Sequence, residues 1–131
     1  WAAKMDAGSL GVRALLLGRS EIAMLFARRR LRADPHDSDS RVLFALAADL
    51  SGHDAEFAHS WNGVPRSSET LSLRGRVMMV EILIRHAGLV AAAPWLGELA
   101  KDKLALAGDP IARRLLTRIE LPDVTLRGSD D

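Results

Sequence analysis

The residues that could perform acid–base chemistry are few and poorly placed for it. The imidazoles are His36, His53, His59 and His86. His59 directly precedes Ser60, and neighbours along a helix do not face each other, so these two do not pair as base and nucleophile. The chain also lacks the Gly-x-Ser-x-Gly turn that exposes a nucleophilic serine in many hydrolases. We therefore expect no catalytic activity.

Metal ligation has even less support. The chain has no cysteine, which removes thiolate ligands and disulfides. Several aspartates lie near the expected ends of helices, where capping of backbone N–H groups explains them: Asp37, Asp39, Asp49 and Asp54. No two histidines stand four residues apart, and no calcium-loop spacing occurs. We expect neither a metal nor a cofactor.

A basic run at residues 28–32, Arg-Arg-Arg-Leu-Arg, leaves two alternatives open, a phosphate or RNA contact and the solvated end of a helix. The net charge is only +1, and Phe26 is the one aromatic residue close enough to stack on bases, so the solvated end is favoured. Trp61 and Trp95 are either ligand platforms or packing wedges, and packing is the commoner role. We expect no nucleic acid partner.

The elements that carry these residues are predicted to be paired helices. Residues 1–17 and 20–33 form the clearest pair, with Gly18 as a left-handed cap between them. Glycines in similar settings follow, with Gly52 placed 34 residues after Gly18 and Gly88 placed 36 residues after Gly52. This repeat length predicts stacked helical hairpins, because one such hairpin cannot bury its apolar face alone.

Start and stop signals place the remaining helices. Pro35 ends the second helix, and Gly11 in the first marks a place where another backbone crosses closely. Pro94 either begins the sixth helix or kinks it. The other helices are expected at residues 38–50, 54–61, 69–86 and 89–107 and from Asp109-Pro110 onward, before a loose tail at 121–131.

Composition limits the class of protein. Hydrophobic residues make up 48% of the chain and charged residues 27%, as in ordinary globular domains. No run of about 18 apolar residues occurs, so we expect no membrane insertion. Arginine dominates the basic residues, which hints at a bacterial source with a GC-rich genome. We expect a soluble protein, for which both the cytoplasm and the periplasm stay open.

The first hairpin resembles a tetratricopeptide repeat. That family's 34-residue unit carries a Leu-Gly pair in its first helix, a glycine at the turn, a small residue in its second helix and a terminal proline. Leu10-Gly11, Gly18, Ala23 and Pro35 stand at those relative positions. The family's aromatic positions hold alanine instead, at Ala7, Ala14 and Ala27.

The resemblance extends over roughly residues 5–107. The second unit keeps Gly52 at the turn and Trp61 at an aromatic position, although Pro65 comes early. The third keeps Gly88, with Glu81 where a small residue is usual. The resemblance implies an all-α fold of antiparallel helical hairpins stacked as a right-handed tetratricopeptide-like solenoid. It would have about three pairs and a C-terminal capping helix within residues 1–120.

The resemblance also implies a concave groove lined by the first helix of each pair. In this chain the groove positions are Val12, Leu15, Leu16, Val42, Leu46, Asp49, Met78, Ile82 and Arg85. Apolar side chains with one acid and one base suit an amphipathic helix or an extended peptide. The alternative is that several of these apolar residues are core. Chaperone-binding members hold a peptide carboxylate with Lys and Asn where this chain has Gly8 and Val12, so that activity is not expected.

We therefore expect a non-catalytic protein–protein interaction scaffold that binds a partner peptide or helix in this groove, as part of a larger bacterial complex. Two other roles stay open. One is a helical accessory domain of a multidomain enzyme or regulator. The other is a self-associating domain whose exposed end pairs with a copy of itself to form a homo-oligomer.

Overall fold

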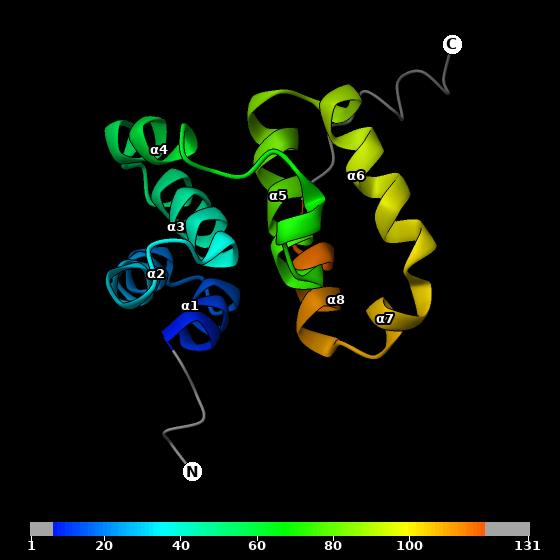
Figure 1. Cartoon of the computed structure of the whole chain (residues 1–131), viewed down its shortest axis with the longest axis horizontal. Coiled ribbons are helices and arrows are strands. Elements are labelled where there is room, and N and C mark those ends of the chain that lie inside the picture. The colour runs from blue at the N-terminus through cyan, green and yellow to red at the C-terminus, as the bar shows by residue number, and fades with distance from the viewer. Residues whose placement is uncertain (1–6, 120–131) are drawn as a thin grey trace.

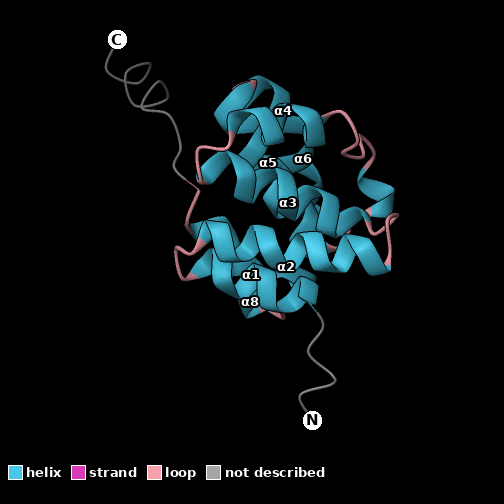
Figure 2. Cartoon of the chain, turned by 90° about the vertical axis from the view of Figure 1, so that its left-hand side faces the viewer, coloured by secondary structure: helices cyan, strands magenta, loops and turns pink. Residues whose placement is uncertain are grey.

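The computed structural model describes residues 7–119, and over this range the protein consists of helices and loops (Figures 1 and 2). Part of the first predicted helix, residues 1–6, and the predicted tail at 121–131 lie outside the described residues. The α-helices are α1 Ala7–Leu16, α2 Ser20–Ala33, α3 Ser38–Leu50, α4 Asp54–Trp61, α5 Leu73–His86, α6 Leu89–Lys101, α7 Lys103–Ala107 and α8 Pro110–Thr117. The predicted all-α class is confirmed for this part of the chain.

The three glycine turns are where the sequence predicts them. Gly18, Gly52 and Gly88 have φ angles of 76°, 78° and 94°, in the left-handed region that favours glycine. At the first turn the N–H of Arg19 donates to the carbonyl oxygen of Ala14 at 2.9 Å, which satisfies an end carbonyl of α1. Each turn therefore reverses the chain and makes a helical hairpin.

The hairpins meet in the middle of the molecule. α1 packs on α2, α2 on α3 and α3 on α4, while α6 and α8 both pack against α5. Figure 1 shows these two groups as the left and right halves of the molecule, with α3 and α5 side by side at the junction. α5 has helices on three sides, which explains why its sequence is apolar around most of its circumference.

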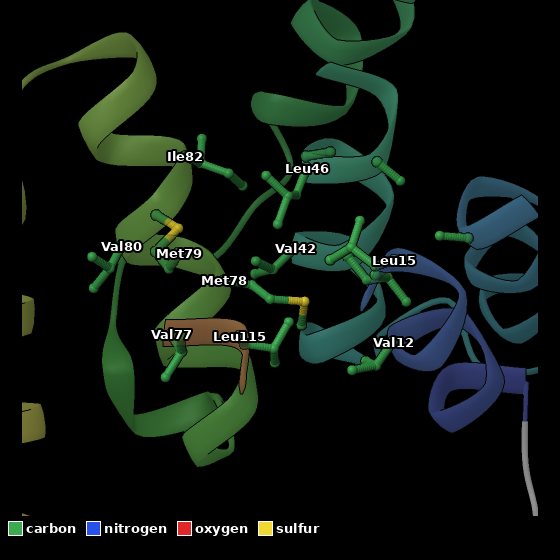
Figure 3. Close-up of a cluster of buried hydrophobic side chains, with 14 of the residues drawn as sticks. Val12, Leu15, Val42, Leu46, Val77, Met78, Met79, Val80, Ile82 and Leu115 are labelled. Atoms are coloured by element: carbon green, nitrogen blue, oxygen red, sulfur yellow. The ribbon is translucent and has the colours of Figure 1, made fainter. Parts of the chain in front are cut away.

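The core lies where α1, α3 and α5 meet (Figure 3). Fully burying one large apolar side chain contributes about 1.5–3 kcal/mol, so these residues supply much of the stability of the fold. The largest fully buried side chains are Leu15, Val42, Leu43, Leu46, Val77, Met78, Met79, Val80, Ile82 and Leu115.

The fifth helix begins later than the sequence predicts. A short 3-10 helix occupies Ser68–Thr70, and α5 begins at Leu73 with Ser72 as its N-cap. The hydroxyl of Ser72 accepts from the N–H of Gly75 at 3.2 Å, and Asp39 of α3 accepts from the N–H of Ser72 at 2.9 Å. The start is fixed by an aspartate 33 residues earlier, which local signals do not reveal.

The sixth predicted helix is two helices. α6 begins at Leu89, so a start at Pro94 is wrong, and it ends at Lys101 rather than running to residue 107. Asp102 interrupts it with ψ of 36°, and α7 follows. The carboxylate of Asp102 accepts from Nη1 of Arg76 in α5 at 2.7 Å, so a tertiary contact holds the residue at the break.

Two further ion pairs attach α8 to α5. Arg74 donates to both carboxylate oxygens of Asp109, through Nε at 3.0 Å and Nη2 at 3.2 Å. Asp109 also caps α8, accepting from the N–H groups of Ile111 and Ala112 at 3.1 Å each. At the other end of α8, Arg118 donates to the buried carboxylate of Glu81. The amphipathic last helix is thus fixed at both ends.

Acid should loosen α8 through Asp109. Burial alone would raise the pKa of this carboxyl, but hydrogen bonds from Arg74 and from the backbone of Ala112 and Ile111 outweigh burial and lower the pKa. Such a group stabilises the fold above its unfolded pKa of 3.8, and this contribution is lost as the pH falls through the folded-state value. Between about pH 5 and about pH 3, the free energy of unfolding should fall less for Asp109→Asn than for wild type in urea titrations. Equal losses would contradict this role.

A matched pair of glycine substitutions tests the α1 crossing. A Cβ at Gly11 would lie 2.7 Å from Cδ2 of the buried Leu43 and 3.4 Å from the carbonyl oxygen of Ala23, whereas a Cβ at Gly97 meets nothing within 4 Å. Each Gly→Ala change gains about 1 kcal/mol of helix propensity. We expect Gly97→Ala to raise the free energy of unfolding by about 0.5–1 kcal/mol and Gly11→Ala to lower it by about 1 kcal/mol or more, measured by urea denaturation. Two stabilising substitutions would mean that the backbones at Gly11 are not in close contact.

Candidate functional site

Most of the predicted groove residues lie in the core. Val12, Leu15, Val42, Leu46, Met78 and Ile82 retain between 0 and 7% of their accessible surface, and Leu16 is half-buried against them. Figure 3 shows the labelled members of this set facing one another across α1, α3 and α5. Their side chains fill the space where the resemblance implies an open groove. The burial of these residues agrees with the alternative interpretation, in which they belong to the core.

The acid and the base predicted in the groove are paired with each other. Oδ2 of Asp49 accepts from Nε of Arg85 at 2.5 Å and lies 2.9 Å from Nε2 of His86. The Asp49 side chain is only 8% exposed, so little of its carboxylate remains for a partner. This cluster joins α3 to the end of α5 and has a structural role.

Trp61 and Trp95 also have packing roles. Trp61 stacks on Phe57 with centroids 5.8 Å apart, and the guanidinium of Arg66 lies 3.9 Å from the centroid of the Trp61 ring. Phe57 in turn stacks on His86 at 4.3 Å, which links α4 to α5. Trp95 is half-buried against the core. These contacts match the packing interpretation of the sequence.

Among residues 7–119, no three His, Cys, Asp or Glu side chains lie where they could hold a metal ion. The two ring nitrogens of His53 lie near carboxylates at the surface, Nε2 at 2.8 Å from Glu21 and Nδ1 at 3.4 Å from Glu56. None of the described helices is long and apolar enough to cross a membrane.

The basic run at residues 28–32 separates into different environments. Arg28 donates to Glu56 of α4 at 2.8 Å, and Nε of Arg30 donates to Asp37 at 2.8 Å. Burial alone would raise the pKa of Asp37, but hydrogen bonds from Arg30 and Ser40 outweigh it and lower this pKa. Arg32 is exposed and makes no ion pair or hydrogen bond with another described residue. Arg28 and Arg30 therefore have structural roles, whereas Arg32 is available to contact a ligand.

Arg28, Leu31 and Arg32 of this run line a pocket of about 440 Å³ between α2, α3, α4 and the turn that follows α4. We call it the arginine-lined pocket. Rigid elements supply most of its wall, because α2, α3 and α4 pack on one another in succession. Its lining residues are Arg28, Leu31, Arg32, Arg41, Phe44, His59, Ser60 and Gly63.

The charge of the arginine-lined pocket is positive and partly uncompensated. Nε of Arg41 donates to the carbonyl oxygen of Pro35 at 2.9 Å, and its Nη1 donates to that of Gly63 at 3.0 Å. These acceptors are neutral, so they fix the guanidinium without cancelling its charge. Arg28 differs, because Glu56 neutralises it, and its guanidinium lies 5.4 Å from the centroid of Phe44. None of the described residues that line the pocket carries a carboxylate.

Sequence reasoning identified the arginines at residues 28–32 but not the rest of this site. Arg41, Phe44 and His59 come from two other helices, and nothing in their spacing marks them as neighbours of α2. Helical spacing in the third helix could have shown only that Arg41 and Phe44 share one face, since they stand three residues apart.

Comparison of the chain with protein-family models, with curated proteins and with solved structures finds no match. The similarity to tetratricopeptide repeats therefore rests on the sequence positions given above.

Proposed function

We propose that this protein is a non-catalytic protein-interaction scaffold whose arginine-lined pocket holds a segment of a partner protein. The helical hairpins serve as the rigid framework, stacked in the manner of a tetratricopeptide-like solenoid. In support of this arrangement, α2 packs both on its own partner α1 and on the first helix of the next hairpin, α3, as adjoining repeats would. The observation that carries the proposal is the pocket itself.

Two properties of the pocket favour a protein segment. Its volume of about 440 Å³ can take a few side chains, and it opens to solvent, so an extended segment can pass across it. Leu31 and Phe44 offer apolar surface beside the hydrogen-bonded Arg41 and the exposed Arg32. Apolar burial supplies affinity and the charges supply orientation, which is the usual division of roles in peptide recognition.

Site-specific photocross-linking tests this function. A photoreactive phenylalanine at position 59 would face the pocket, and the same residue at position 113, on the exposed face of α8, would serve as the control. In lysate of the source cell we expect a discrete protein adduct from position 59 that is absent from position 113 and is lost when Arg32→Glu is added. The same adducts at both positions, or none at position 59, would contradict the proposal.

Self-association is the second candidate, because α6 and α7 expose large apolar side chains. Val90 is 89% exposed and Leu104 is 91% exposed. Exposed apolar side chains such as these can form a contact between two copies of a protein. If it does, sedimentation equilibrium should show a mass that rises with protein concentration for wild type and stays at 14.3 kDa for Leu104→Glu. A wild-type mass that stays at that of the monomer would exclude this role.

A further inference from the structure

The arginine-lined pocket combines an apolar floor with a fixed cation. Of the five N–H groups of Arg41, one at Nε and one at Nη1 are used by Pro35 and Gly63. Both N–H groups of Nη2 and the second of Nη1 have no acceptor among the described residues. A guanidinium held this way is oriented in advance for an oxyanion. From this arrangement we infer, building on the proposed function, that the partner segment is an acidic peptide with a carboxylate beside an apolar side chain.

The carboxylate would lie between Arg32 and Arg41. These are the two pocket arginines that have no ion pair among residues 7–119, whereas Arg28 is occupied by Glu56 at 2.8 Å. Arg41 supplies a preset direction, and the exposed Arg32 can close over the bound group. Two guanidiniums around one carboxylate form charge-assisted hydrogen bonds, which are stronger than neutral ones.

The neighbouring apolar side chain would pack on Leu31 and Phe44. Phe44 is half-buried and packs against the core, so it gives a firm surface. The guanidinium of Arg28 lies over its ring, 5.4 Å from the centroid, so a nucleobase would have to displace it to stack on that face. An aliphatic side chain can lie along the ring edge and Leu31 without displacing Arg28.

The charges around the pocket favour a peptide carboxylate over more highly charged ligands. Glu56 lies 2.8 Å from Arg28 and neutralises it, so this end of the pocket offers no net positive charge to a phosphate dianion or a phosphodiester chain. The net charge of the chain is +1, so no strong long-range field adds to the attraction of such ligands. A single carboxylate placed toward Arg32 and Arg41 avoids Glu56.

Fluorescence anisotropy with defined peptides tests the inference. The probe is a fluorescein-labelled peptide, acetyl-Gly-Ser-Gly-Leu-Glu-Gly-Ser-amide. Three control peptides carry Gln for Glu, Ser for Leu, or phosphoserine for Glu. A single-stranded RNA of similar length is the last ligand tested. We expect the Leu-Glu peptide to bind about tenfold more tightly than the Gln and Ser control peptides, and more tightly than the phosphoserine peptide or the RNA.

The variants Arg32→Gln and Arg114→Gln remove the same charge from the pocket and from the exposed face of α8. Arg32→Gln should weaken binding of the Leu-Glu peptide about tenfold, and Arg114→Gln should leave the Kd of this peptide unchanged. Equal binding of the Glu and Gln peptides, tighter binding of the phosphoserine peptide or the RNA, or no binding of any peptide would overturn the inference.

The two proposals can fail separately. An adduct from position 59 together with equal binding of the Glu and Gln peptides would leave the protein-interaction role standing and remove the acidic preference. The absence of both the adduct and peptide binding would remove both.

Discussion

Leu46→Glu is expected to leave the protein unfolded at 25 °C. Leu46 is fully buried, and its neighbours in Figure 3 come from α3 and α5. Losing a buried leucine costs about 2–5 kcal/mol, and an unpaired carboxylate at the same place costs several more. Domains of this size have only about 5–15 kcal/mol of stability in total. Far-ultraviolet circular dichroism should therefore show the loss of most helical signal.

A graded series makes this prediction quantitative. Leu46→Ala should fold but lose about 3 kcal/mol in urea denaturation, because it leaves a cavity between α3 and α5. The control is Leu25→Glu, at a leucine that is 60% exposed on α2, and it should change the free energy of unfolding by less than about 1 kcal/mol. A Leu46→Glu protein with native helix content would show that this position faces an open groove after all.

Arg118→Ala should destabilise the protein by about 3 kcal/mol at neutral pH. It removes the guanidinium that neutralises the carboxylate of Glu81, whose side chain is only 8% exposed. Burial raises the pKa of Glu81, and Arg118 opposes that rise, so the pKa should climb further in the variant. Adding Glu81→Gln to Arg118→Ala should restore much of the lost stability, because a neutral amide is cheaper to bury than an unpaired charge.

The same variant has a pH signature. A carboxyl whose folded-state pKa is raised contributes stability below its unfolded pKa of 4.5 and loses that contribution as the pH rises through the folded-state value. The deficit of Arg118→Ala should therefore shrink as the pH is lowered from about 7 toward about 5. The control is Arg114→Ala, at an exposed arginine in α8, the helix that Arg118 directly follows. A deficit shared by both variants, or one independent of pH, would show that Glu81 does not depend on Arg118.

Local signals in the sequence predicted most of the helix ends correctly. The turns at Gly18, Gly52 and Gly88 need only the freedom of glycine to adopt positive φ, and the start of α8 needs only Asp109 as a cap before Pro110. The start of α5 depends on Asp39, and the break at Asp102 depends on Arg76. Residues far apart in sequence decide these last two features, so a local pattern misplaces them.

The predicted groove shows a second limit of sequence patterns. Apolar residues at helical spacing, such as Val42 and Leu46, identify a face that avoids water, but they do not say whether a partner or the protein itself covers it. Here α5 covers that face of α3. The arginine-lined pocket was missed for the opposite reason, since no single helix contains enough of it to form a pattern.

Chemical-shift mapping with the Leu-Glu peptide tests the central claim most directly. In ¹H–¹⁵N spectra of the wild-type protein, we expect the largest perturbations at residues that line the arginine-lined pocket, including the Nε–H of Arg41 and the amides of Phe44 and Gly63. The amide chemical shifts of the core residues Val12 and Met78 should remain unchanged. Perturbations centred on α1, α5 or α6, with the pocket resonances unmoved, would contradict the account and place the working surface elsewhere.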